Sequence, residues 1–225
     1  MYLNDIAMIA ADTTRTQFYL QNLVKHNLYP KCVILLLNSS DQPLPGQISS
    51  RSENRIVSIL EEKNIDYEVL FNDDINSSEA IKSIENRPES VFIFSGFGGV
   101  LLKEKVLNLG KRFLHVHGGY LPNYKGSTTN YYSMLEENII GASSIFLTKD
   151  IDCGPILLRK KFKAPSDREK IDHFHDSKVR SEVLVETLKK YVEYGDWSFK
   201  FQDNQKGETY YIIHPVLKHL AILGN

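Results

Sequence analysis

The segment FLHVHGGYLPNYKG, residues 113 to 126, contains two histidines one residue apart, followed by two glycines and a proline. If the segment begins as a β-strand, His115 and His117 point to the same side of it. An imidazole has an unperturbed pKa of about 6.5 and can accept and return a proton at neutral pH, so this pair is suited to proton transfer. Two other interpretations stay open: hydrogen-bonded histidines at a strand end, and ligands of a metal ion.

The metal interpretation is the weakest of the three. Two imidazoles need at least one further ligand, and the nearest other histidines, His173 and His175, lie in a charged segment of helical period. Side chains in such a segment are expected to be solvated. We therefore predict that the protein holds no metal ion.

A second segment, KDIDCGPILL at residues 149 to 158, supplies a carboxylate. Glycine and proline would hold Asp152 in a turn ahead of an apolar strand, where it could reach a catalytic histidine and fix its tautomer. The alternative is that Asp152 is a simple turn residue.

A third segment, SGFGGV at residues 95 to 100, follows an apolar run and could let a ligand approach the backbone closely. Its G-x-G-G spacing is not that of a dinucleotide-binding fingerprint, and the first apolar run continues into ADTTRT without a glycine. A nicotinamide-dependent oxidoreductase is therefore disfavoured, and a generic tight turn remains an alternative for this segment.

Short apolar runs alternate with segments of helical period along the first half of the chain. Strands are expected at 6–11, 32–37, 66–71 and 90–95, helices at 13–25, around 56–60 and at 79–85, and a loop at 39–47. The strands are continuously apolar, so both faces of the sheet must be covered. This predicts an α/β fold with a doubly wound, mostly parallel sheet and helices on both faces.

The second half is expected to continue in the same way. A helix closed by Gly110, a strand at 113–117, a helix at about 127–137, an antiparallel pair at 142–148 and 154–162, and a last helix at 214–223 are predicted. Ser166 and Asp167 are predicted to cap the helical region after them. We expect residues 1–165 to form an α/β domain, with 166–225 as a C-terminal helical segment and tail packed on it.

Composition limits the function classes. With 42% hydrophobic residues, 24% charged residues and a formal net charge of -1, the chain gives no electrostatic reason to expect a nucleic-acid partner. Cys32 and Cys153 are too few for a disulfide framework, and no export signal opens the chain, so a cytoplasmic protein is expected. The longest apolar run, 32–37, is far shorter than the roughly 20 residues that span a bilayer, so no membrane partner is expected.

Taken together, HVHGGYLPNYKG and DCGPIL resemble the folate-dependent formyltransferases, the group that contains the glycinamide ribonucleotide, methionyl-tRNA and sugar N-formyltransferases. That family's pattern is Asn-x-His, then Leu-Pro-x-Tyr-Arg-Gly, then Asp-x-Gly-(Pro/Asp)-Ile. The resemblance covers residues 90–165 well and the rest by architecture only. It implies a Rossmann-like formyltransferase fold and an N-formyltransferase whose donor is 10-formyltetrahydrofolate.

Carried over by position, the resemblance places His117 on the catalytic histidine and Asp152 on the catalytic aspartate. His115 stands where the family has an asparagine that donates an N–H to the formyl oxygen as charge develops there. Losing one such donor typically costs about 10²- to 10³-fold in rate, although an imidazole can also donate. The resemblance implies donor binding by Gly96, Phe97, Gly98, Gly99 and Ile151. It implies acceptor binding by Tyr120, Tyr124 and Lys125.

The reaction implied is attack by an amine on the formyl carbon, with His115 at the oxyanion and Asp152 orienting His117. A nucleotide-linked amino sugar is the expected acceptor, by elimination. The chain has no room for the further domain of the methionyl-tRNA enzymes, and ADTTRT replaces the phosphate loop of the glycinamide ribonucleotide enzymes. Small-molecule substrates are expected, and the chain is a candidate homodimer. A non-catalytic folate- or nucleotide-binding protein and a formyltetrahydrofolate hydrolase are two further possibilities for a chain of this pattern.

Overall fold

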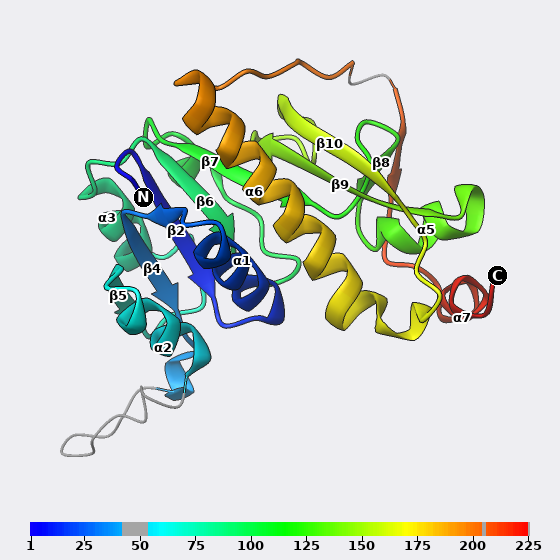
Figure 1. Cartoon of the computed structure of the whole chain (residues 1–225), viewed down its shortest axis with the longest axis horizontal. Helices are drawn as coiled ribbons and strands as arrows, with labels where there is room; N and C mark the ends of the chain where they lie inside the picture. Colours follow the sequence, from blue (N-terminus) through cyan, green and yellow to red (C-terminus); the bar gives the residue numbers. More distant parts are fainter. Residues whose placement is uncertain (42–53, 204–205, 225) are drawn as a thin grey trace. The chain divides into compact units, whose positions relative to one another are not determined.

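The computed structural model describes residues 1–41, 54–203 and 206–224, in two compact units, Met1–Leu114 and His115–Asn225 (Figure 1). Of the loop predicted at 39–47, Ser39–Asp41 form a 3-10 turn and the rest lies outside the described residues. The division that the sequence suggested after residue 165 stays a prediction.

Parallel strands form the sheet of the first unit, in the order β7, β6, β2, β4, β5. Their bounds are β2 (Ile6–Ala11), β4 (Cys32–Leu36), β5 (Asp66–Leu70), β6 (Val91–Ser95) and β7 (Arg112–His117), which ends in the second unit. Two short strands, β1 (Tyr2–Leu3) and β3 (Tyr29–Pro30), form a separate parallel pair. Because β4 lies on one side of β2 and β6 on the other, the winding reverses there, and such a switch point is where ligands bind in doubly wound sheets. The predicted sheet is confirmed.

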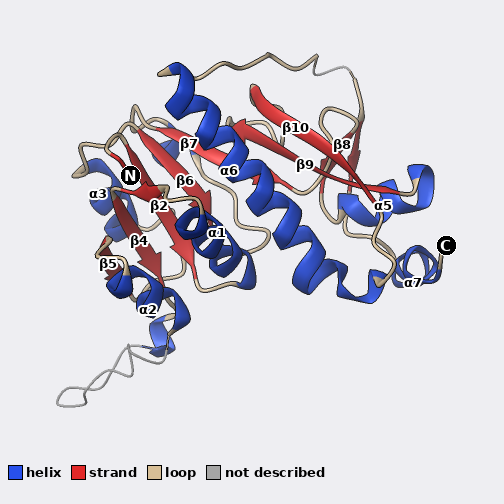
Figure 2. Cartoon of the chain, viewed as in Figure 1, coloured by secondary structure: helices blue, strands red, loops and turns tan. Residues whose placement is uncertain are grey.

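Helices cover both faces of this sheet (Figure 2). In the view of Figure 1, α1 (Thr14–Lys25) and α2 (Arg55–Glu62) lie in front of the sheet and α3 (Ser78–Glu85) lies behind it, and α4 (Glu104–Leu107) precedes β7. Three of these helices begin at a polar side chain that accepts a backbone N–H, namely Thr13, Asn54 and Ser77. All residues of β2, β4 and β6 are buried, as their continuous apolar runs predicted.

An antiparallel pair of strands is the framework of the second unit. β9 (Ile139–Phe146) pairs with β10 (Ile156–Lys163), as the sequence predicted, with an irregularity between Ile156 and Leu158. The helices α5 (Thr129–Glu137) and α6 (Asp176–Tyr194) pack on β9, and α7 (Pro215–Leu223) packs on α5. The parallel pair β8 (Tyr124–Gly126) and β11 (Glu208–Tyr210) was not predicted from the sequence.

The predicted helix cap before α6 is wrong. The chain enters α6 through a 3-10 turn (Arg168–Lys170) and a π-helical turn (Ile171–His175), and the side chain of Asp167 makes no capping hydrogen bond. Its carboxylate is instead 3.1 Å from Lys170 Nζ and 2.7 Å from His175 Nε2. The hydrogen bond from Lys170 and then that from His175 lower the pKa of Asp167, because both favour its charged form.

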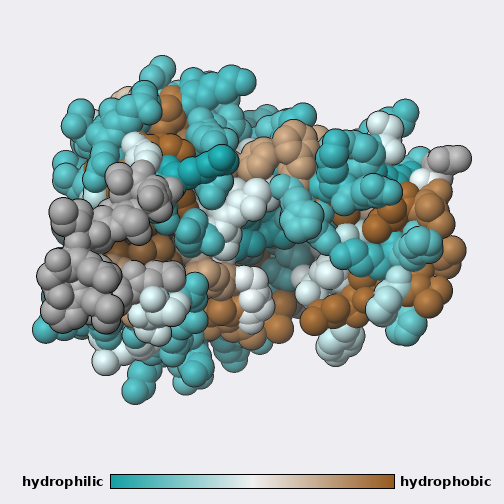
Figure 3. Space-filling view, turned by 90° about the horizontal axis from the view of Figure 1, so that it is seen from below, coloured by the Kyte–Doolittle hydropathy of each residue, from teal (hydrophilic) through white to brown (hydrophobic). Residues whose placement is uncertain are grey.

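Apolar side chains are exposed near the C-terminal end of the described chain. Figure 3 shows hydrophobic surface over α7 and beside it. The exposed apolar residues there are Tyr211, Ile212, Val216, Leu217, Leu220 and Leu223. Among the described helices none has the length and apolar character needed to cross a membrane.

Candidate active site

His117 is the last residue of β7 and is only 5% exposed. Its Nε2 lies 2.7 Å from the backbone oxygen of Tyr124. A carbonyl oxygen only accepts, so Nε2 must carry the hydrogen of this bond. The other ring nitrogen, Nδ1, is 3.3 Å from Oδ2 of Asp152.

Asp152 occupies the turn between β9 and β10 in the left-handed backbone region, at φ +53°, and is 9% exposed. Its Oδ2 accepts the backbone N–H of Gly126 at 2.8 Å. Its backbone oxygen accepts from Nε2 of Gln202 at 2.8 Å, and the same amide donates to the oxygen of Gly154 at 2.6 Å. The carboxylate is therefore positioned independently of the histidine it faces.

These contacts make the pair a place to hold one proton. With Nε2 already donating to Tyr124, a hydrogen placed on Nδ1 gives an imidazolium beside the carboxylate of Asp152, and its removal gives a neutral ring. The two separated sequence segments thus bring an imidazole and a carboxylate into contact.

The two glycines after His117 let the chain turn tightly against the ring. A side chain at Gly119 would place its Cβ 2.6 Å from Nε2 of His117. The carbonyls of the turn are held by hydroxyls: Thr129 donates to Gly118, and Ser143 donates to Gly119 at 2.7 Å. The Leu121–Pro122 peptide bond that follows is cis.

A partly buried polar network at the end of β7 was not predicted from the sequence. Arg180 donates to the backbone oxygen of Val116 at 3.2 Å and pairs with Asp176 at 2.9 Å. Asn130 donates to the same aspartate at 2.9 Å and accepts the backbone N–H of Gly141 at 2.8 Å. The i, i+4 spacing of Asp176 and Arg180 was the only signal in the sequence, and it does not distinguish a partly buried network from an exposed surface pair.

Of the residues expected to bind the acceptor, Tyr124 and Lys125 are only 2% and 3% exposed. The hydroxyl of Tyr124 lies between two carboxylates, 2.9 Å from Glu136 and 2.8 Å from Glu137, and shares its one hydrogen between them. Burial, followed by these contacts, raises the pKa of Tyr124. Tyr120 is half-buried, with the guanidinium of Arg159 4.6 Å from its ring centre. Contact of these residues with an acceptor stays a prediction.

The residues expected to bind the donor fall in both units. In the first unit, Gly96 is buried and Phe97 is half-buried, whereas Gly98 and Gly99 are exposed, with nothing within 4 Å of the Cβ that either would carry. This loop follows β6 at the switch point of the sheet. Arg15 holds its start by donating to the oxygen of Gly96. In the second unit, Ile151 is 49% exposed.

His115 is half-buried on β7, two positions before His117, so the alternation of the strand places both on one face. Nε2 of His175 lies 2.7 Å from Oδ1 of Asp167. Within residues 1–41, 54–203 and 206–224, no three His, Cys, Asp or Glu side chains group closely enough to hold a metal ion.

Known proteins resemble this chain in sequence and in fold. The sequence profile of the formyl transferase family matches residues 4–186. A methionyl-tRNA formyltransferase from Mycoplasmopsis pulmonis is 31% identical over 143 residues, which cover 62% of this chain and 49% of that protein. The chain therefore spans about half the length of that relative.

Solved structures share the fold at low sequence identity. A sugar N-formyltransferase from Shewanella sp. superposes with a TM-score of 0.61 at 15% identity, over 97% of this chain and 86% of that one. HypX from Aquifex aeolicus, in complex with tetrahydrofolic acid, superposes with a TM-score of 0.62 at 13% identity, over 95% of this chain and 30% of that one. With the family profile covering most of its length, this chain belongs to the formyl transferase family.

Proposed function

We propose that this protein transfers the formyl group of 10-formyltetrahydrofolate to the primary amine of a nucleotide-linked amino sugar. The main support for this proposal is the contact between His117 Nδ1 and Asp152 Oδ2, at 3.3 Å. The two residues belong to separate segments of the chain that both fit the family pattern, within the residues that the family profile matches. The open space at Gly98 and Gly99, beyond β6, suits a flat heterocycle that approaches the backbone. The sugar N-formyltransferase of similar fold supports the acceptor class.

In this mechanism the acceptor amine forms a bond to the formyl carbon, and the carbonyl oxygen becomes an oxyanion. His115 donates a hydrogen bond to that oxygen. Nδ1 of His117 takes the proton that the amine loses, and Asp152 stabilises the resulting imidazolium. Return of that proton to the departing nitrogen of the donor, as its bond to carbon breaks, completes the transfer and restores the neutral ring.

The test is a formyl-transfer assay with 10-formyltetrahydrofolate and a panel of amines: amino-sugar nucleotides, free amino sugars, glycinamide ribonucleotide and methionyl-tRNA. The proposal expects a formylated amino-sugar nucleotide, detected by mass spectrometry, and its loss in His117→Ala. A product only with methionyl-tRNA would overturn the acceptor while keeping the reaction. Methionyl-tRNA is included in the panel because the relative from Mycoplasmopsis pulmonis is a methionyl-tRNA formyltransferase.

The same assay distinguishes a transferase from a hydrolase and from a non-catalytic protein. Release of formate without any amine identifies a hydrolase. Binding of a reduced folate with neither product identifies a non-catalytic protein, the outcome expected if His115 cannot replace the family's asparagine. We further propose a cytoplasmic protein that acts on small molecules as a homodimer, and analytical ultracentrifugation tests the dimer.

A further inference from the structure

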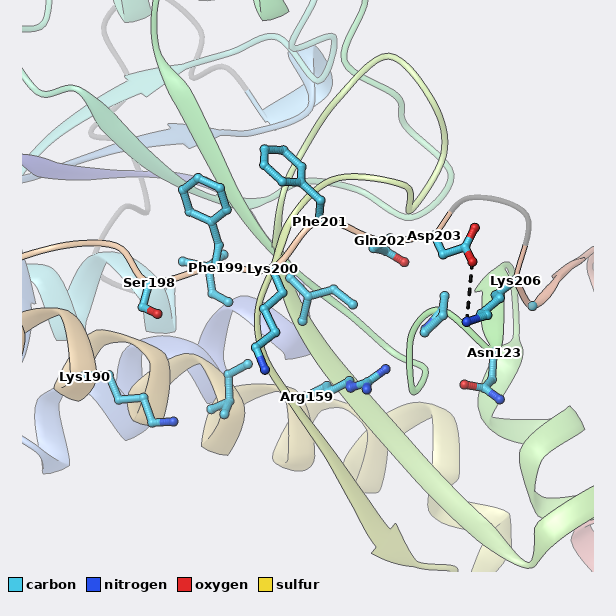
Figure 4. Close-up of a pocket in the computed structure, with 15 residues that line it drawn as sticks. Asn123, Arg159, Lys190, Ser198, Phe199, Lys200, Phe201, Gln202, Asp203 and Lys206 are labelled. Atoms are coloured by element: carbon cyan, nitrogen blue, oxygen red, sulfur yellow. Dashed lines mark ion pairs between the residues drawn. The ribbon is translucent and has the colours of Figure 1, made fainter.

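A cavity of about 830 Å³ lies in the second unit, between β10, the residues that follow α6 and the residues just before β8 (Figure 4). This volume is within the range of small-molecule sites. Part of its wall is apolar and half-buried, formed by Ile156, Leu157 and Leu158 of β10. Neither the proton-transfer pair nor the expected donor-binding residues line this cavity.

Positive charge is concentrated around it. Arg159, Lys190, Lys200 and Lys206 line the cavity, with Asp203 as the only acidic residue among its lining residues. Lys206 is 3.5 Å from Asp203, whereas Lys190 and Lys200 make no ion pair within the described parts of the chain. The whole chain has a formal net charge of -1, so this local excess is not a general property of the protein. Such clusters raise the local concentration of anions.

The basic side chains come from different elements of the cavity wall, and the guanidinium of Arg159 also donates to the backbone oxygen of Leu121. In Figure 4, Lys190 extends from α6, Arg159 from β10 and Lys200 from the extended segment after α6, whereas the rings of Phe199 and Phe201 turn to the opposite side of that segment. Lys200 is fixed at its backbone by two hydrogen bonds with Ile156, each of 2.8 Å. The arrangement therefore suits an anion that several basic groups contact together.

Two residues of the cavity wall connect it to the catalytic pair. Gln202 lines the cavity and donates to the backbone oxygen of Asp152 at 2.8 Å. Asn123 lines it as well and directly precedes Tyr124, whose backbone oxygen holds His117. A ligand in the cavity would lie against both segments that position the proton-transfer pair.

We propose that this cavity binds the diphosphate group of a phosphorylated ligand, through Lys190, Lys200 and Arg159. Resting on the proposed function, this ligand is the nucleotide-linked acceptor. A diphosphate matches the cavity because it carries several negative charges over the span of a few bonds, and because lysine and arginine are the usual protein contacts of phosphate oxygens.

The test measures binding separately from catalysis. Isothermal titration calorimetry with UDP, inorganic pyrophosphate and uridine should show binding of the first two, weakening as salt is added, and none of uridine. Trp197 is the only tryptophan of the chain, is 6% exposed and precedes Ser198 of the cavity wall, so its fluorescence should change with the same ligands. The double variant Lys190→Glu, Lys200→Glu should bind UDP at least tenfold more weakly.

Lys189→Glu is the matched control, since Lys189 is an exposed neighbour on α6 outside the cavity lining, and it should bind UDP as the wild type does. The proposal is overturned if neither UDP nor pyrophosphate binds, if uridine binds as well as UDP, or if the double variant binds like the wild type. Formyl transfer with an unchanged KM for an amino-sugar nucleotide in the double variant would overturn the cavity and leave the proposed function standing. Charge-dependent UDP binding without any formyl transfer would support the cavity as an anion site and overturn the proposed function.

Discussion

Oδ2 of Asp152 lies 3.3 Å from Nδ1 of His117 and accepts the backbone N–H of Gly126 at 2.8 Å. Oδ2 of Asp152 thus contacts both the imidazole of His117 and a main-chain N–H, which carries no charge. Since Gly126 and Gln202 hold the aspartate in place, its position does not depend on the protonation of the histidine. A rigid carboxylate of this kind stabilises charge on a neighbouring ring without rearranging.

Replacing Asp152 by Asn should lower kcat for formyl transfer by about 10²- to 10⁴-fold, the usual range for loss of acid–base catalysis. Asparagine tolerates the left-handed backbone of this turn, so the fold should be kept. The imidazole would nevertheless lose its charged partner. Asp150→Asn, at an exposed position of the same turn, is the control and should retain wild-type activity. Activity of Asp152→Asn within about twofold of the wild type would contradict the assignment.

His115→Asn restores the family's residue at the position expected to contact the formyl oxygen. Because the asparagine amide donates an N–H there, kcat should be preserved or raised, whereas His115→Ala should lose about 10²- to 10³-fold. Steady-state kinetics on both variants and the wild type measures this. If His115→Asn were inactive beside an active wild type, the imidazole would have a task that an amide cannot perform.

Gln202 joins the residues after α6 to the turn that contains Asp152, by donating to two carbonyls, those of Asp152 and Gly154. Gln202→Glu replaces both donors by carboxylate oxygens facing those carbonyls. We expect a loss of stability of about 1–3 kcal/mol, from two unsatisfied carbonyls and a buried repulsion. Urea unfolding followed by Trp197 fluorescence measures the change. Gln202→Lys is the control because its side chain can still donate a hydrogen bond. If the free energy of unfolding of Gln202→Lys were as low as that of Gln202→Glu, loss of the hydrogen bonds would not be the cause.

Gly126 has φ +93°, and a side chain there would collide with the backbone oxygen of Tyr210 in β11. Gly126→Ala should therefore separate β8 from β11 and destabilise the fold by more than backbone strain alone explains. Gly195→Ala is the matched control, since Gly195 has φ +71° with open space around its Cβ position. Strain there should cost about 1–2 kcal/mol. Equal losses of melting temperature in the two variants would contradict the collision.

Tyr210 should make the protein sensitive to alkaline pH. Burial, and then its hydrogen bond to Glu136, raises the pKa of Tyr210 to about 12 from the usual 10.0. A pKa raised on folding gives stability that is present below pH 10 and is lost as the pH rises towards 12. Melting temperature should fall over that window, and fall less in Tyr210→Phe. Tyr211→Phe, whose ring is 80% exposed, should behave as the wild type.

Much of the fold could be predicted from the sequence because its signals are local. The continuous apolar runs of β2, β4 and β6 required cover on both faces, and the antiparallel pair β9 and β10 lies within one short stretch of chain. The helix cap predicted at Asp167 is wrong because the Asp167 carboxylate pairs with Lys170 and His175 instead. Propensity alone does not show which of two available partners a carboxylate takes.

For the candidate site, the sequence alone determined which residue types stand in which order: an imidazole on a strand, a tight glycine turn and an aspartate in a later turn. Only the tertiary structure decided that Nδ1 of His117 faces Asp152 while Nε2 is held by Tyr124, and that Gln202 supports the turn. It also placed Tyr124 and Lys125 in the interior and gathered the basic residues of the cavity. The reason is physical: strand and turn signals come from neighbouring residues, whereas side-chain contacts depend on segments that meet only once the chain has packed.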